Sequence, residues 1–187
     1  MKTVIRKVFA NHEKEEKWLN EMSAKGFAFI DYTWCRYVFS DSQPGEYTYR
    51  LELLEYLPSH PVSQKYIQFM EESGTEHVTS YMRWVYFRKK TSDGAFDIYS
   101  DIDSKIKHYQ RISLLYLVIG IGNLLASSLN FSLWLGLLRG DPSYPLPMLN
   151  LTVAVMSGIL GLGILIVFRH PLRRKMKKLK KDKLILE

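Results

Sequence analysis

Residues 112–168 decide the fold, and they read ISLLYLVIGIGNLLASSLNFSLWLGLLRGDPSYPLPMLNLTVAVMSGILGLGILIVF. Residues 112–138 and 142–168 carry no charge, and each run is 27 residues long by count. A helix needs about 20 apolar residues to cross a bilayer, whereas a long helix in a soluble core normally has a charged face. We therefore predict a transmembrane helical hairpin with spans at about 112–136 and 148–168. A fully buried helical pair is the alternative, but the remaining chain is too short to cover it.

The positive charge of the chain is concentrated behind this hairpin. The sequence has 26 lysines and arginines against 19 acids. Residues 169–187 hold nine of the bases and two of the acids, which leaves 17 of each sign (26 − 9 and 19 − 2) in the rest of the chain. The basic character is therefore a property of the tail.

Bases near the ends of the spans predict the orientation. Lys105, Lys107 and Arg111 precede the first span and the basic tail follows the second, whereas residues 139–147 between the spans have one base and one acid. By the positive-inside rule, both termini are expected in the cytoplasm of a multi-pass cell-membrane protein. The tail either sets this topology alone or also binds anionic lipid as an amphipathic helix on the inner leaflet. The candidate lipid-binding residues are Arg173, Arg174, Lys175, Lys177 and Lys178.

Small residues predict a packing face within the membrane. Ala154 with Gly158, and Ser157 with Gly161, are small-x-x-x-small pairs that let two helices approach closely. Gly120 and Asn123 on the first span are candidates for the facing surface. This face is expected to close the hairpin or to form a homodimer. Neither run contains an ionisable group, which argues against a transport path.

The first 92 residues predict a separate α+β domain. Alternating apolar residues predict strands, and Asn11 is placed to cap a helix that ends near Gly26. The expected order is strand 2–9, helix 12–26, strand 27–39, strand 46–55, a helix capped by Ser63 that ends near Gly74, and strand 78–88. This β-α-β-β-α-β order predicts a ferredoxin-like fold, with two helices on one face of a four-stranded antiparallel sheet.

The segment 93–111 joins this domain to the first span. Ser100 is placed to cap a helix, with acids in its first turn and bases at its end, as the helix dipole favours. We expect this helix either to continue into the first span as a rigid rod or to lie at the bilayer surface. The predicted domains are therefore 1–92, 93–111, 112–168 and 169–187.

Four motifs in this order resemble one known family. They lie at residues 15–26 (EEKWLNEMSAKG), 44–50 (PGEYTYR), 84–90 (WVYFRKK) and 98–109 (IYSDIDSKIKHY). The family is an uncharacterised bacterial membrane-protein family, mostly of Gram-positive organisms, whose members are commonly encoded beside PadR-type transcriptional repressors. The similarity covers about residues 2–111. It implies a regulatory or envelope-stress role, but no catalytic residues.

The sequence carries no motif for catalysis, metal or cofactor binding. Its histidines are scattered, and it has neither a glycine-rich phosphate loop nor a nucleophile elbow. The single cysteine, Cys35, excludes an intramolecular disulfide and is expected to be structural. Tyr47 and Tyr49 are needed for the core, which argues against an RNA-binding platform on the sheet. We therefore expect no enzyme, no cofactor and no nucleic-acid partner.

Two hypotheses for function remain. The first is a membrane-anchored cytoplasmic sensor or interaction module that acts through a partner protein or a bound hydrophobic compound. Its candidate surface is Tyr32, Trp34, Trp84 and Tyr86, because one helical layer cannot cover both faces of strands so rich in aromatic residues. The second is an accessory subunit of a membrane transporter or export system, in which the spans contact the partner.

Overall fold

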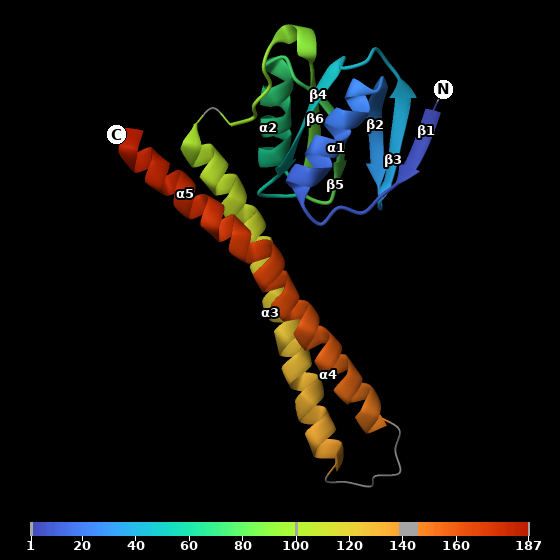
Figure 1. Ribbon diagram of the computed structural model, residues 1–187, viewed down its shortest axis with the longest axis vertical. Coiled ribbons are helices and arrows are strands. Elements are labelled where there is room, and N and C mark those ends of the chain that lie inside the picture. The colour runs from blue at the N-terminus through green and yellow to red at the C-terminus, as the bar shows by residue number, and fades with distance from the viewer. Residues whose placement is uncertain (1, 100, 139–145, 187) are drawn as a thin grey trace. The chain divides into compact units, whose positions relative to one another are not determined.

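The computed structural model describes residues 2–99, 101–138 and 146–186, which fall into two compact units, residues 1–100 and 101–187 (Figure 1). The N-terminal unit contains β1 (Lys2–Arg6), α1 (His12–Ala24), β2 (Phe27–Thr33), β3 (Arg36–Asp41), β4 (Tyr47–Leu53), α2 (Pro61–Glu72), β5 (Glu76–Tyr81), β6 (Trp84–Lys90) and the short helix η1 (Thr91–Asp93). The C-terminal unit contains α3 (Ile102–Leu138), α4 (Leu146–Gly163), the π-helix η2 (Ile164–Arg169) and α5 (His170–Leu186).

The N-terminal unit is built from two three-stranded antiparallel sheets. Their strand orders are β1-β3-β2 and β4-β6-β5. The α+β class is as predicted, but the single four-stranded ferredoxin-like sheet is not what the chain forms. The reason is that each of the predicted strands 27–39 and 78–88 folds back on itself. Two-residue turns at 34–35 and 82–83 convert them into the hairpins β2–β3 and β5–β6.

The two sheets belong to a structural repeat of 48 residues. Each half has the order β-α-β-β, and Gly26 and Gly74, which are 48 positions apart, end the two helix regions with the same φ of 84°. The register shift between residues 29 and 31 of β2 recurs between residues 77 and 79 of β5, again 48 positions later. Because turn, glycine and bulge all share this offset, the N-terminal unit is an internal duplication of one β-α-β-β motif.

Side chains of α1 cover the outer edge of β4. The Asn20 side chain donates to the backbone carbonyl of Tyr49 (3.1 Å) and accepts from its N–H (2.8 Å). One helical turn later, Ser23 Oγ donates to the carbonyl of Tyr47 (2.6 Å), and one turn earlier the Glu16 carboxylate accepts from the next outward N–H of β4 (3.1 Å). An unpaired strand edge invites pairing with another chain. Here α1 satisfies that edge within the molecule.

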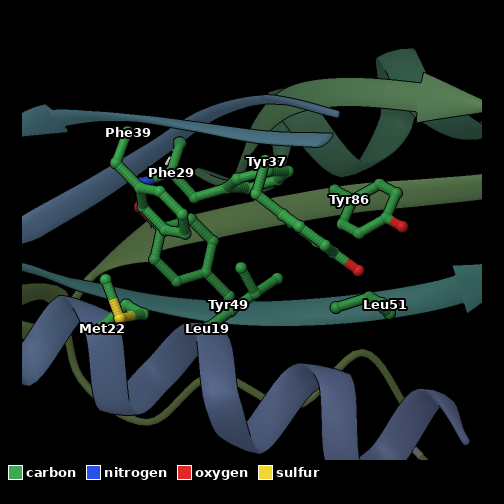
Figure 2. Packing of buried hydrophobic residues seen from close by; sticks show 8 residues of the cluster. All are labelled: Leu19, Met22, Phe29, Tyr37, Phe39, Tyr49, Leu51 and Tyr86. Atoms are coloured by element: carbon green, nitrogen blue, oxygen red, sulfur yellow. Dashed lines mark hydrogen bonds between the residues drawn. The ribbon is translucent and has the colours of Figure 1, made fainter. Parts of the chain in front are cut away.

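The main core lies between α1 and the sheets (Figure 2). Asn11 caps α1 as predicted, since its side chain accepts from the N–H groups of Glu13 and Lys14. The apolar side of α1 then packs against aromatic residues from both sheets. The buried cluster consists of Leu19, Met22, Phe29, Tyr37, Phe39, Tyr49, Leu51 and Tyr86.

A second cluster packs under α2. His60, rather than Ser63, caps this helix, and its Nδ1 accepts from the Val62 N–H (3.2 Å). The Ser63 hydroxyl instead donates to the carbonyl of Tyr56 (3.2 Å). The segment after β6 returns to this region and adds Phe96 to the cluster, whose other buried members are Leu54, Met70, Val85 and Phe87.

The C-terminal unit contains two helices that are long and apolar enough to cross a membrane. The candidate spans are Ile102–Gly136 and Met148–Leu184, and α3 and α4 lie side by side (Figure 1). The rod predicted for 93–111 is present from Ile102 on, because α3 continues without a break into the first apolar run. Asp101 accepts from the Ser104 N–H (2.6 Å) at the start of α3. Ser100, the predicted cap, lies outside the described residues, as does the segment 139–145.

Candidate functional site

The four aromatic residues predicted as a partner surface do not share one. Tyr86 is 2% exposed and belongs to the core. Tyr32 is half-buried, with its ring 4.7 Å from that of Tyr37, and Trp84 stacks on His12 at 5.5 Å between centroids. Only Trp34, at the tip of the β2–β3 hairpin, is largely exposed.

The physical reason for this difference is the extra pair of strands. The prediction assumed that one helical layer had to cover a single sheet, which would leave one aromatic face open. Folding into two sheets gives the aromatic residues of β2 and β6 a second sheet to pack on, so Tyr32 and Tyr86 lie 5.6 Å apart, ring to ring.

A buried carboxyl group joins the two sheets to α1. The hydroxyls of Tyr37 on β3 and Tyr86 on β6 both donate to Glu15 Oε1, each over 2.7 Å. Burial raises the pKa of the Glu15 carboxyl above its ordinary value, and the two tyrosine hydrogen bonds oppose that shift. Burial and the neighbouring Glu15 charge also raise the pKa of both tyrosines, which stay protonated donors. This cluster fixes the sheets relative to the helix, and the nine-tenths burial of Glu15 keeps it away from solutes.

Exposed apolar residues of α2 and of the loop before it form what we call the α2 surface: Val62 and Phe69 on the helix, and Tyr56 and Leu57 in the loop, with exposed fractions of 55, 60, 42 and 56%. Val62 and Phe69 are seven residues apart and therefore share one helix face. The preceding loop is fixed by stacking of Tyr56 on His60, with centroids 4.3 Å apart. Apolar residues exposed together on a helix and its adjoining loop are typical of an interaction surface.

The predicted small residues of the hairpin lie where α3 meets α4. A Cβ on Gly161 would come within 2.9 Å of the Gly120 carbonyl oxygen and 3.2 Å of Asn123 Cβ, and a Cβ on Gly158 within 2.9 Å of Ser127 Oγ. The Ser127 hydroxyl donates across the interface to the carbonyl of Ala154, which is 3% exposed.

Two of the predicted packing residues hydrogen-bond within their own helices. The Ser157 hydroxyl donates to the carbonyls of Val153 (2.6 Å) and Ala154 (3.3 Å), and the Asn123 amide donates to the Ile119 carbonyl (2.9 Å). The remaining small residues therefore close the hairpin itself, which was one of the two uses expected for them.

The basic tail forms a helix that packs along the first turns of α3. Leu172 is 8% exposed, and Lys183 pairs with Asp103 over 2.8 Å. The apolar side of α5 contacts α3, and contact of its basic side with the inner leaflet stays a prediction. All five candidate lipid-binding residues are exposed within the first nine residues of α5: Arg173, Arg174, Lys175, Lys177 and Lys178.

Within residues 2–99, 101–138 and 146–186, no three His, Cys, Asp or Glu side chains are grouped to hold a metal ion. A groove lies between α3 and α5, and its lining mixes Asp103 with Lys107, Lys180 and Lys183. Lys183 and Asp103 satisfy each other at its rim.

Comparison with known proteins identifies the family. No curated protein and no solved structure matches the chain. The family model of a protein of unknown function, DUF2812, matches residues 11–121, from the start of α1 into the apolar part of α3. This match spans more than half of the chain and includes the junction between the two units. The chain therefore belongs to the DUF2812 family of proteins of unknown function.

Proposed function

We propose that the protein is a membrane-anchored interaction module without catalysis of its own. In this proposal α3 and α4 anchor the chain in the cell membrane with both termini in the cytoplasm, and the N-terminal unit captures a partner protein there. Two helices long and apolar enough to span a bilayer support the anchor. The excess of bases before the first and after the second charge-free run supports the orientation.

The single observation that carries the capture of a protein is the α2 surface. Folding gains nothing from leaving Phe69 60% exposed, since the inner side of α2 already fills the second core cluster. An apolar helix face suits another helix or strand, and large apolar side chains dominate the energy of such contacts. The partner is therefore a protein that presents an apolar stripe to α2.

The role is proposed to be regulatory. The resemblance of the motifs at 15–26, 44–50, 84–90 and 98–109 to a family encoded beside PadR-type repressors supports this part. The module would hold its partner at the membrane in one physiological state and release it in another. A reporter for the neighbouring repressor's promoter should then respond to deletion of the gene, and an unchanged reporter under envelope stress would contradict the regulatory role.

The capture is tested by cross-linking the full-length protein in its native membranes, followed by purification and mass spectrometry. Val62→Ser combined with Phe69→Ser should lower recovery of the partner by about tenfold or more, since two apolar anchors are lost. The matched control is Gln64→Ser with Glu71→Ser, which changes two exposed residues of α2 at the same spacing. Equal recovery from the test and control variants would contradict the proposal.

The accessory-subunit hypothesis makes a different prediction. The outward residues of both candidate spans, such as Leu125, Leu129 and Ile159, are large and apolar, as lipid alone would favour. Replacing both spans by unrelated apolar helices should leave partner capture intact if the N-terminal unit is responsible. Loss of capture in that chimera, while it still inserts, would favour the accessory subunit.

A further inference from the structure

The turn between β2 and β3 has an unusual composition. Trp34 and Cys35 occupy the two central positions with φ of 43° and 61°. Both values lie in the left-handed region, as a type I′ turn requires, where asparagine and glycine are strongly preferred. A bulky residue there is a backbone outlier, and the 77% exposure of Trp34 means that the fold gains no packing from it. Such a residue points to a role outside the fold.

The repeat places a second apolar residue at the same position. Met82 lies 48 residues after Trp34, at the first central position of the β5–β6 turn, with a φ of 53° and 70% exposure. Glycine is the usual residue at that position of a two-residue turn as well. Both halves of the duplication therefore present a large apolar side chain at a hairpin tip.

The two tips and the β1–α1 loop lie at one end of the N-terminal unit (Figure 1). β2 and β5 run side by side, because Thr79 Oγ1 donates to Asp31 and the Tyr32 and Tyr81 rings are 5.2 Å apart just before the two turns. The Lys7 N–H donates to the Cys35 carbonyl (2.9 Å), which places the next residue, Val8, beside the first tip.

We call this end, formed by Val8, Trp34 and Met82, the tip surface. Val8 is 76% exposed, so all three side chains project away from the unit. Three exposed bases stand directly beside these residues in the sequence: Arg6 and Lys7 precede Val8, and Arg36 follows the first turn. Separate protruding apolar side chains flanked by bases suit the headgroup region of a bilayer, where tryptophan is favoured and arginine meets anionic lipid.

We propose that the tip surface inserts into the interfacial region of the bilayer, with Val8, Trp34 and Met82 among the lipid chains and Arg6 and Arg36 on anionic headgroups. This inference rests on the proposed membrane anchor: the first charge-free run begins at Ile112, 16 residues after Phe96 in the core, so the bilayer that holds this run is tethered to the N-terminal unit. A tethered surface needs only weak affinity to stay bound, because the tether raises its effective concentration. This docking is independent of the α2 surface.

The test uses the full-length protein in lipid nanodiscs and the fluorescence of Trp34. A Trp134→Phe background removes the tryptophan of the first candidate span, and the difference from the same protein with Trp34→Phe isolates the Trp34 emission. In nanodiscs of phosphatidylcholine with phosphatidylglycerol, dibrominated chains should quench this emission by about half or more, as for a residue at chain depth. Phosphatidylcholine alone should give weaker quenching.

Two variants separate the parts of the proposal. Arg6→Gln with Arg36→Gln should remove the extra quenching due to phosphatidylglycerol. Lys89→Gln with Lys90→Gln, at the end of β6 away from the tip, should not. Trp34→Asn with Cys35→Gly should raise the Tm of the N-terminal unit, because the pair suits the turn. If Met82→Trp is added as a reporter, emission from position 82 should be quenched less in that variant than in the protein that keeps Trp34 and Cys35.

Trp34 emission that is the same with and without bromine would overturn the proposal. An emission shift that appears only when membrane proteins are added, without bromine quenching, would also overturn it, because a protein would then cover the tips.

Discussion

Glu15 is the buried acid at the centre of the N-terminal unit. A carboxyl group in the core costs free energy unless its hydrogen bonds are met, and here two tyrosine hydroxyls from different sheets meet them on one oxygen. Because burial raises the pKa of Glu15, the folded state binds this proton more tightly than the unfolded state does. The contribution of Glu15 to the free energy of unfolding is therefore largest below its ordinary value of 4.5 and declines as the pH rises through the raised pKa.

Glu15→Gln keeps an oxygen that can accept both tyrosine hydroxyls but removes the titration. We expect the variant to gain stability over the wild-type protein as the pH rises, from near parity at about pH 4.5 to a clear advantage at about pH 8. Urea unfolding of the full-length protein in nanodiscs, followed by tryptophan fluorescence, measures this. A constant difference between the two proteins across that range would contradict the assignment.

Single residues could be predicted where their role is local. The cap at Asn11 follows from residue type and position alone. The positions of Tyr86 and Trp34 could not be predicted, because both lie in strands or turns with aromatic residues on both faces, and burial there depends on which second sheet is present.

At the scale of elements, hydrogen bonds from side chains of α1 hold the edge strand β4. Asn20→Ala removes both hydrogen bonds to the backbone of Tyr49 on the edge strand. We expect a loss of about 2 kcal/mol in the free energy of unfolding, since two part-buried backbone groups lose their partners. The repeat offers a matched control in Gln68→Ala, 48 residues later on α2, where the exposed side chain bonds only Glu72 among the described contacts. That control should change stability by less than about 0.5 kcal/mol, and equal losses would contradict the role of Asn20.

The packing of the helical hairpin should be sensitive to a substitution at Gly161. A methyl group there would meet the backbone oxygen of Gly120 at 2.9 Å, which cannot move aside as a flexible side chain can. Gly161→Ala should therefore destabilise the packing of α3 on α4 by about 1–3 kcal/mol. Gly122→Ala, with no atom within 4 Å of the added carbon, is the control. SDS titration followed by circular dichroism measures the stability of both variants. Equal unfolding midpoints for the two would contradict the assignment of Gly161 to the helix interface.

Elements could be predicted where residue types characteristic of helix ends or of membrane spans mark their boundaries. Gly26 and Gly74 mark helix ends, and charge-free length marks the two long helices. The hairpin turns at 34–35 and 82–83 could not be predicted, because they contain neither glycine, proline nor asparagine. Without these turns the repeat could not be predicted either, because each predicted strand, 27–39 and 78–88, covers two strands of the structure.

At the scale of the whole molecule, a duplicated β-α-β-β unit is joined to two long apolar helices by a short segment. The repeat gives the N-terminal unit two differentiated halves, one whose helix covers a strand edge and one whose helix presents the α2 surface. In our proposal the membrane supplies the position and this unit supplies the recognition. Sequence alone predicted that division, because charge-free length and strand alternation are separate patterns in separate parts of the chain.

The central claim is that two spans hold the N-terminal unit on the cytoplasmic side of the membrane. Cys35 is the single cysteine of the chain and is partly exposed, so it reports the side of that unit. Ser143→Cys in a Cys35→Ser background reports the segment between the candidate spans, which lies outside the described residues. A membrane-impermeant maleimide should label the cysteine at position 143 in intact cells, and Cys35 only after lysis in detergent, which also removes the bilayer from the tip surface. Labelling of Cys35 in intact cells, or recovery of the protein without membranes, would contradict the account.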